Sequence, residues 1–186
     1  MLRQILLFLS IAFSSCIYAQ SYKDSVKVQF LRYTDLLVNK EYSKSTDYLN
    51  PEFFKIIPKS QLIAIMEKAY NNPAMDFEIE SPSVTLIDDN QVIGSANYVK
   101  LQYSNYLKMH FKTSDGSKQD TALTKRALEA QFGQNNVTYD AIKDTYRIFV
   151  TKNVIAHSKD KLNWTFVVVE DKQKPILEKF IPKELL

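Results

Sequence analysis

The sequence predicts an α+β fold in which N-terminal helices pack on a curved antiparallel sheet. Beyond residue 20, apolar residues first recur at helical spacing and then, through most of the chain, alternate with polar residues. Helical and strand patterns are thus segregated, which favours an antiparallel sheet over a parallel one. Only three glycines occur in 186 residues, which argues against a turn-rich sandwich.

Three helices are expected before the first strand. The helix predicted over residues 21–39 carries one apolar stripe, formed by Val26, Phe30, Tyr33 and Leu37. A short helix over 41–49 ends before Pro51, because a residue that precedes proline avoids helical angles. The third helix begins at Pro58, runs to Tyr70 and turns four side chains inward, namely Leu62, Ile63, Met66 and Ala69.

Two strands follow these helices. Apolar and acidic residues alternate over 75–80, and the strand continues over 84–87 beyond a break at Pro82. After a turn at 88–90, residues 91–112 are expected to form one long strand. Because few strands reach this length, we expect a bulge or bend in it, near Asn97 or near Ser104 and Asn105.

The second half of the chain contributes one more helix and two more strands. A polar loop covers 113–120, and a helix over 121–132 ends at Gly133. The remaining elements are an extended segment over 137–142, a strand over 145–157, a turn over 158–161, a strand over 162–170 and a short helix within the tail 175–186.

Residues 1–19 have the pattern of a secretory signal peptide. Arg3 precedes a nine-residue apolar run, and a short segment then ends in Ala19. The run is too short to cross a bilayer, which takes about 20 residues. We therefore expect a periplasmic or secreted domain over residues 20–186. In the alternative, the segment ending at Cys16 is a lipobox and the protein is a lipoprotein anchored at Cys16.

Composition limits the chemistry that is open to this chain. The formal net charge is only +3 and the lysines are dispersed, so no nucleic-acid surface is predicted. Cys16 is the only cysteine and belongs to the predicted leader, which leaves residues 20–186 without a disulfide or a thiolate nucleophile. With two histidines and no further cysteine, we expect no metal site and no cofactor.

Residues 39–54 and 162–166 resemble the NTF2-like (cystatin-like, SnoaL-like) superfamily. The first segment holds an Asn-Lys-Glu-Tyr turn after the first helix and a following aromatic stretch, and the second holds a Trp-x-Phe element in the last strand. The resemblance covers about residues 22–170. It implies a cone-shaped sheet with an apolar pocket between sheet and helices, in which enzymes of the superfamily place acid and base residues such as an Asp–His pair.

We expect three residues to line such a pocket, namely Tyr103, Asn105 and Trp164. Asn105 interrupts an apolar row, and its buried amide needs a partner from a ligand or from the backbone. His110 and His157 lie at strand ends beside lysines, and no Asp/His pair occurs on the predicted apolar faces, so no catalytic residue is predicted. The run Asp88-Asp89-Asn90 is interpreted as a turn, because it lacks the glycine and distal glutamate of a calcium loop.

The function expected from these patterns is non-enzymatic binding of a small apolar ligand or of a partner protein in the cell envelope. Two alternatives stay open. One is a pocket enzyme of the isomerase or hydrolase type, and the other is a purely structural protein whose pocket is filled by side chains. No transmembrane segment is expected after the leader, and a homodimer is left open.

Mass spectrometry of the exported protein tests the leader. Cleavage after Ala19 should give an N-terminus at Gln20 or its pyroglutamate. A diacylated Cys16 would instead show that the lipoprotein alternative holds.

Overall fold

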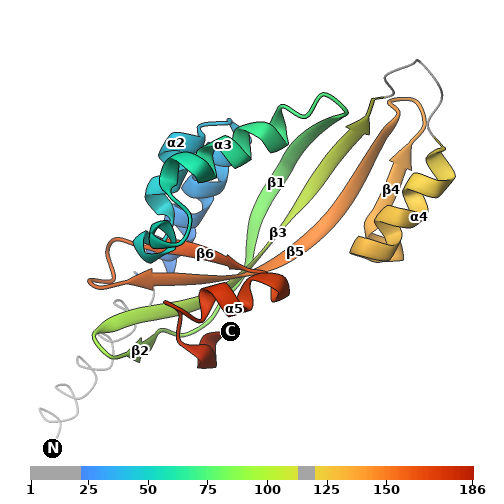
Figure 1. The fold of residues 1–186 in the computed structure, drawn as a ribbon. Coiled ribbons are helices and arrows are strands. Elements are labelled where there is room, and N and C mark those ends of the chain that lie inside the picture. Colours follow the sequence, from blue (N-terminus) through green and yellow to red (C-terminus); the bar gives the residue numbers. More distant parts are fainter. Residues whose placement is uncertain (1–21, 113–119) are drawn as a thin grey trace, which may run out of the picture.

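Two long antiparallel strands organise the fold, β3 (Ala96–Phe111) and β5 (Thr145–Ser158). The computed structural model describes residues 22–112 and 120–186, and it has the α+β architecture expected from the sequence, with helices packed on a curved antiparallel sheet (Figure 1). The predicted leader 1–19 with Cys16, and the predicted loop 113–120 apart from its last residue, lie outside the described residues.

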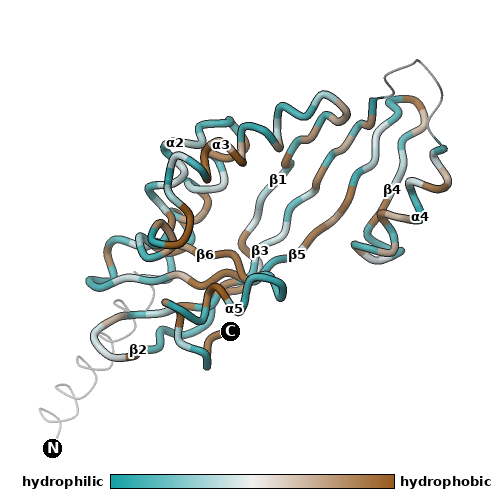
Figure 2. The backbone as a smooth tube through the Cα atoms, viewed as in Figure 1, coloured by the Kyte–Doolittle hydropathy of each residue, from teal (hydrophilic) through white to brown (hydrophobic). Residues whose placement is uncertain are grey.

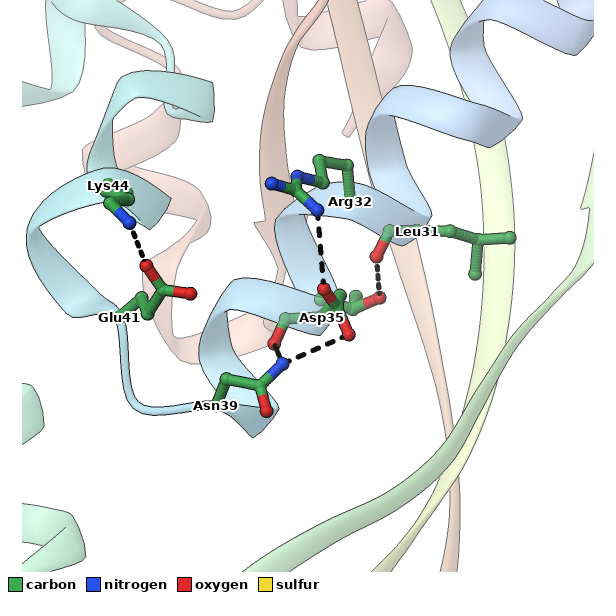
Figure 3. A network of polar contacts seen from close by, with 7 residues as sticks. Leu31, Arg32, Asp35, Asn39, Glu41 and Lys44 are labelled. Atoms are coloured by element: carbon green, nitrogen blue, oxygen red, sulfur yellow. Dashed lines mark hydrogen bonds and ion pairs between the residues drawn. The ribbon is translucent and has the colours of Figure 1, made fainter.

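The N-terminal helix covers residues 22–38, and side-chain hydrogen bonds mark its C-terminal end. Asn39 Nδ2 donates to the Asp35 carbonyl at 2.9 Å and to its carboxylate at 3.2 Å, and Arg32 pairs with the same carboxylate (Figure 3). Lys40 then takes a φ of 61°, a left-handed conformation that no helix continues. An ion pair between Lys44 and Glu41 bridges the start of the next helix. The predicted stop at Asn39 is confirmed.

Short helices connect the N-terminal helix to the sheet. The predicted helix over 41–49 is α2 (Tyr42–Ser45) followed by the 3₁₀ turn η1 (Thr46–Tyr48). Asn50 then caps η2 (Pro51–Lys55) by accepting from the Glu52 amide at 3.0 Å. The third helix, α3 (Lys59–Tyr70), has the predicted extent but no fully buried side chain, and Ala69, predicted to point inward, is exposed.

Six strands form one antiparallel sheet in the order β1-β3-β5-β4, with β2 paired to β3 and β6 paired to β5. The strands that flank β3 are β1 (Met75–Ile87) and β2 (Gln91–Ile93). Those that flank β5 are β4 (Val137–Asp140) and β6 (Thr165–Val169). The remaining elements are α4 (Thr121–Phe132), η3 (Gln134–Asn136), η4 (Asp171–Gln173), α5 (Lys174–Leu177) and η5 (Lys183–Leu185).

The prediction of one strand over 91–112 is wrong, because the chain turns back at Gly94, whose φ is +61°, so that β2 and β3 form a hairpin. An irregularity does occur opposite Asn105, near one of the two expected places, but β1 carries it. β1 shifts register against β3 between Glu80 and Ser83, around Pro82, whereas β3 pairs with β5 without a shift. Proline lacks the amide that a regular ladder needs, so the bulge falls where the proline lies.

The last strand is shorter than predicted, because a turn around Asp160 occupies its first residues. The Asp160 carboxylate accepts hydrogen bonds from Ser158, Leu162 and Asn163 at 2.8–2.9 Å, and these bonds hold the pKa of that carboxyl well below its usual range. The turn exposes Leu162, which a strand over 162–170 would have placed on the same face as Trp164. Trp164 itself is buried, and its indole N–H donates to the Lys161 carbonyl at 3.1 Å.

Helices cover both ends of one sheet face. We call this face, which carries Leu101 and Val154 at one end and Tyr146 and Ile148 at the other, the inner face. The N-terminal helix packs on its first end and α4 on its second (Figure 1). The outer face is covered at the first end by the C-terminal tail, through Leu177, Ile181 and Leu185. Hydrophobic stretches of the chain gather around β6 and the adjoining part of β5 (Figure 2).

Trp164 and Leu162 form a matched test of this register. Trp164 is 2% exposed, so Trp164→Ala should lower the free energy of unfolding by about 3–5 kcal/mol. Leu162 is 70% exposed, and Leu162→Ala should change it by less than about 0.5 kcal/mol. Urea unfolding followed by circular dichroism measures both, and equal losses for the two variants would contradict the described turn.

Candidate ligand-binding site

A pocket of about 140 Å³ lies beneath α3. Its walls come from the N-terminal helix, from η2 and α3, and from β6. Eight of its nine lining residues are apolar or aromatic, and the ninth is Gln173; they are Tyr33, Leu49, Phe53, Leu62, Met66, Phe166, Val167, Val168 and Gln173. Such a lining suits an apolar group and provides few polar contacts.

The pocket exists because α3 is not seated in the core. Its inward residues Leu62 and Met66 are only half-buried, and Ile65 on its other side is 50% exposed. The helix is flanked by Pro58 at one end and by Asn71, Asn72 and Pro73 at the other, so the chain changes direction before and after it. Apolar side chains therefore cover the pocket without filling it.

Four tyrosines from four different elements gather at the inner end of this region. We call Tyr33, Tyr42, Tyr70 and Tyr103 the tyrosine cluster. The ring centroids of Tyr42 and Tyr70 lie 5.2 Å apart. Phe30 lies between the other two tyrosines: its ring centroid is 5.9 Å from that of Tyr33 and 4.9 Å from that of Tyr103. The Tyr42 hydroxyl is buried and has no hydrogen-bond partner among the described residues. The cluster thus combines apolar rings with at least one unused hydrogen-bonding group.

Burial sets the protonation of these phenols. Desolvation raises the pKa of Tyr33 and of Tyr70 far above the ordinary value, and it raises the pKa of Tyr103 to about 12. The neighbouring phenols reinforce the increase in Tyr33 and Tyr70, and Glu170 reinforces it in Tyr103. The hydroxyls therefore remain protonated at neutral pH and can donate to an acceptor, but they do not act as bases.

Two of the three predicted pocket residues, Tyr103 and Asn105, lie side by side on the inner face. Asn105 is 4% exposed, and its amide Nδ2 donates to the Tyr106 carbonyl at 3.2 Å. The backbone thus supplies the partner that the sequence pattern required. Lys152 is paired across the sheet with Tyr103 and forms an ion pair with Glu170 at 2.6 Å. These residues form a polar centre between the apolar clusters at the two ends of the sheet.

The structure does not bring Trp164 to Tyr103 and Asn105. The adjacent Thr165 is level with His157 and Tyr98, five residues from Tyr103 along β3, which is about 17 Å at the rise of a strand. Trp164 packs instead against Tyr22, with ring centroids 6.5 Å apart, and its backbone amide donates to Gln29 at 2.9 Å. It belongs to the apolar cluster beneath the N-terminal helix.

His110, predicted at a strand end beside lysines, also has carboxylate neighbours. Its Nδ1 lies 3.4 Å from Asp76, and its Nε2 lies 3.9 Å from Asp144. The pairing register of β1 and β3 creates the first contact, because Asp76 and His110 are cross-strand partners. The group lies on the outer face and is partly exposed, and Lys112 also binds Asp76 at 2.6 Å. It is an ion-pair cluster outside the pocket.

His157 is half-buried on the outer face. It packs against the Tyr98 ring at 5.2 Å, and its Nδ1 lies 3.4 Å from the Thr165 hydroxyl. Desolvation, together with nearby Lys159, lowers the pKa of this imidazole below its ordinary value. The setting keeps the ring neutral as part of the packing.

Two other hollows lie away from the tyrosine cluster. One, of about 390 Å³, is bounded by polar residues of β3 and β5 and by the C-terminal tail, including Lys100, Gln102, Asn153 and Lys174. The other, of about 350 Å³, lies beside β5 near the end of α4. Residues 88–90 link β1 to β2, and no cluster of three metal-ligating side chains occurs within residues 22–112 and 120–186.

No protein-family model, curated protein or solved structure matches this chain. Among the helices of the described residues, none is both long and apolar enough to cross a membrane.

Several residues of the candidate site were not singled out by sequence reasoning. Tyr33 and Met66 were predicted only as core positions, Tyr70 only as the end of a helix, and Phe53 only as part of the family resemblance. The one available signal was the abundance of aromatic residues, 11 Tyr and 11 Phe. Their convergence depends on how α3 crosses the sheet, which periodicity does not encode.

The lowered pKa of His157 predicts a pH dependence of stability. The unfolded chain binds a proton near pH 6.5 before the folded protein does, so the free energy of unfolding should fall as pH decreases below about 6.5. His157→Gln should flatten this fall. Urea unfolding of both proteins between pH 8 and pH 5 measures it, with pH 8 as the reference where both imidazole states are neutral. An unchanged slope in the variant would contradict the buried neutral ring.

Proposed function

We propose that this protein is a non-enzymatic binding module that holds a small apolar ligand in the pocket beneath α3. The observation that carries the proposal is the unfilled apolar space of about 140 Å³ between the N-terminal helix, α3 and β6. The pocket is open to solvent on one side, and its walls are apolar. A small apolar molecule that fills it would remove this wall surface from water, which favours binding.

The pocket dimensions limit the ligand class. A space of this size holds one aromatic ring or a short branched alkyl group. A larger amphipathic molecule would place only its apolar end in the pocket, and the rest of the molecule would extend out past Gln173. Tyr33, which lines the pocket, and the adjoining phenols are donors at neutral pH, so a ligand with a neutral oxygen acceptor next to its apolar part fits best.

The enzyme alternative receives less support from the lining. General acid–base catalysis needs a group that titrates near the working pH within reach of the substrate. Tyr33 is the only titratable residue among those that line the pocket, and its pKa is raised far from neutrality. His110 and His157 both lie on the outer face. The composition therefore favours binding over proton transfer.

The proposed setting is the cell envelope, as the export pattern of residues 1–19 suggests. A protein there meets apolar molecules, including fragments of lipids, at low concentration in water. An apolar pocket under a weakly seated helix suits capture and release, because an element with little buried surface opens at low cost. A protein partner is treated separately below, since it would use a different surface.

Toluene is the simplest probe of the pocket. Titration with toluene should shift the ¹³C-methyl resonance of Met66 and raise the melting temperature, because a ligand that binds only the folded state stabilises it. Leu62→Trp should abolish both effects by filling the space. Ile65→Trp on the exposed side of the same helix is the matched control and should retain them. The absence of toluene binding to the wild-type protein would refute the proposed function.

A further inference from the structure

One stretch of β5 has a free backbone edge inside the sheet. β4 pairs with β5 over Thr145–Ile148, and β6 pairs with it over Asn153–His157. The two short strands therefore lie end to end along the same edge of β5 (Figure 1). Between them, residues 149–152 pair with β3 on one side and with no described residue on the other. We call this stretch the β5 gap.

The direction of the backbone groups in the β5 gap follows from neighbouring hydrogen bonds. The Arg147 carbonyl accepts from the side-chain hydroxyl of Thr138 in β4, and the His157 carbonyl accepts from the side-chain hydroxyl of Thr165 in β6. The Ser158 carbonyl instead accepts from the side-chain amide of Asn97 in β3. In an antiparallel strand these directions alternate, so odd-numbered residues of β5 face the β4 and β6 edge. Phe149 and Thr151 therefore turn two N–H and two C=O groups into the gap.

The outer edges of β1 and β6 are blunted or covered. β1 contains Pro82, two register shifts and a left-handed Ser81 with φ 51°, and it carries acidic side chains. The free edge of β6 meets Leu49 opposite Phe166. These are devices by which sheets avoid unwanted pairing. The β5 gap, Phe-Val-Thr-Lys, holds neither proline nor a bulge and has high strand propensity. Its one charged side chain, Lys152, forms an ion pair with Glu170.

A hollow of about 350 Å³ adjoins the β5 gap. Phe132 at the end of α4 and Asn136 in η3 form one wall, and the gap residues Phe149, Val150 and Thr151 form the other. Phe149 is partly exposed, and its ring lies 5.3 Å from that of Tyr106 on the outer face. The space beside the free edge can thus receive an additional strand together with an apolar side chain.

We propose that the β5 gap binds an extended segment of a partner protein, which adds a short strand between β4 and β6. Alternating donors and acceptors of a β-edge match a polypeptide backbone, and this match identifies the chemistry of the occupant. Two outward-facing residues allow up to four backbone hydrogen bonds. The segment needs at least four extended residues, with an apolar side chain directed toward Phe132. This inference is independent of the pocket beneath α3.

A second copy of this chain is a poor occupant. Insertion requires a strand with a free and regular edge. Within residues 22–112 and 120–186, β3 and β5 are central, β2 has only three residues, and β4 and β6 are already paired with β5. β1 is the long strand with a free edge, and Pro82 and its bulges make it irregular. The described strands of a second copy therefore fit the β5 gap poorly, and a segment of another protein is the proposed occupant.

An array of capped hexapeptides, varied at the four central positions among Val, Thr, Phe and Lys, is the probe. The strongest binder is then titrated against the full-length protein and two variants. Thr151→Pro removes one outward N–H without touching the pairing with β3, and proline is tolerated where the amide faces an open edge. Thr151→Val keeps that N–H and is the matched control. We expect Thr151→Val to bind like the wild type and Thr151→Pro to bind about tenfold more weakly or worse.

Amide hydrogen exchange provides a second measurement that does not depend on the folding of the proline variant. In the free wild-type protein, the amides of Phe149 and Thr151 should exchange faster than those of Val150 and Lys152, and the peptide should slow the first pair only. The proposal is overturned if no peptide in the array binds, if Thr151→Pro binds as well as the wild type while folded, or if the peptide protects other amides instead. Dimerisation that Thr151→Pro abolishes would also overturn it, because the occupant would then be a second copy.

Discussion

The structure depends on the unbroken pairing between β3 and β5. Their register runs without a bulge from Asn97 opposite Ser158 to Met109 opposite Tyr146. Every other strand attaches to one of these two, so the pair fixes the curvature and both faces of the sheet. A pair this long exceeds what one helix covers. The N-terminal helix and α4 therefore pack on opposite ends of the inner face, and the polar centre with Tyr103, Asn105 and Lys152 lies between them.

Both proposed sites follow from this division of the inner face. Because the N-terminal helix already covers the apolar cluster at the first end, α3 packs on the rim with half-buried side chains and leaves the pocket. Because β4 supports α4 and β6 supports the N-terminal helix, the two strands occupy separate parts of the β5 edge and leave the gap. Unfinished packing and unfinished pairing thus occur where two substructures meet, which is where binding surfaces are commonly found.

Local sequence patterns predicted the kinds of secondary-structure element and most of their order. They failed for features that depend on contacts between residues far apart in the sequence. Period-two alternation predicted β1 and β5 well, since less exposed and more exposed side chains alternate along most of each strand. The β2–β3 hairpin was missed because Gly94 looks like an interruption in one strand. The contact of His110 with Asp76 depends on strand register, and the assembly of the tyrosine cluster depends on helix placement. Neither is encoded by spacing along the chain.

The tyrosine cluster is hard to explain by folding alone. Its rings provide burial, but a phenylalanine ring would provide the same burial without a hydroxyl. The buried Tyr42 hydroxyl has no partner among the described residues, and an unsatisfied buried group costs about 1–3 kcal/mol. Desolvation raises the pKa of Tyr33 and of Tyr70, and neighbouring phenols add to the increase, Tyr103 and Tyr70 for Tyr33, and Tyr42 and Tyr103 for Tyr70. Tyr33 is the member of the cluster that lines the pocket beneath α3, so the proposed oxygen acceptor of a ligand would meet that phenol first.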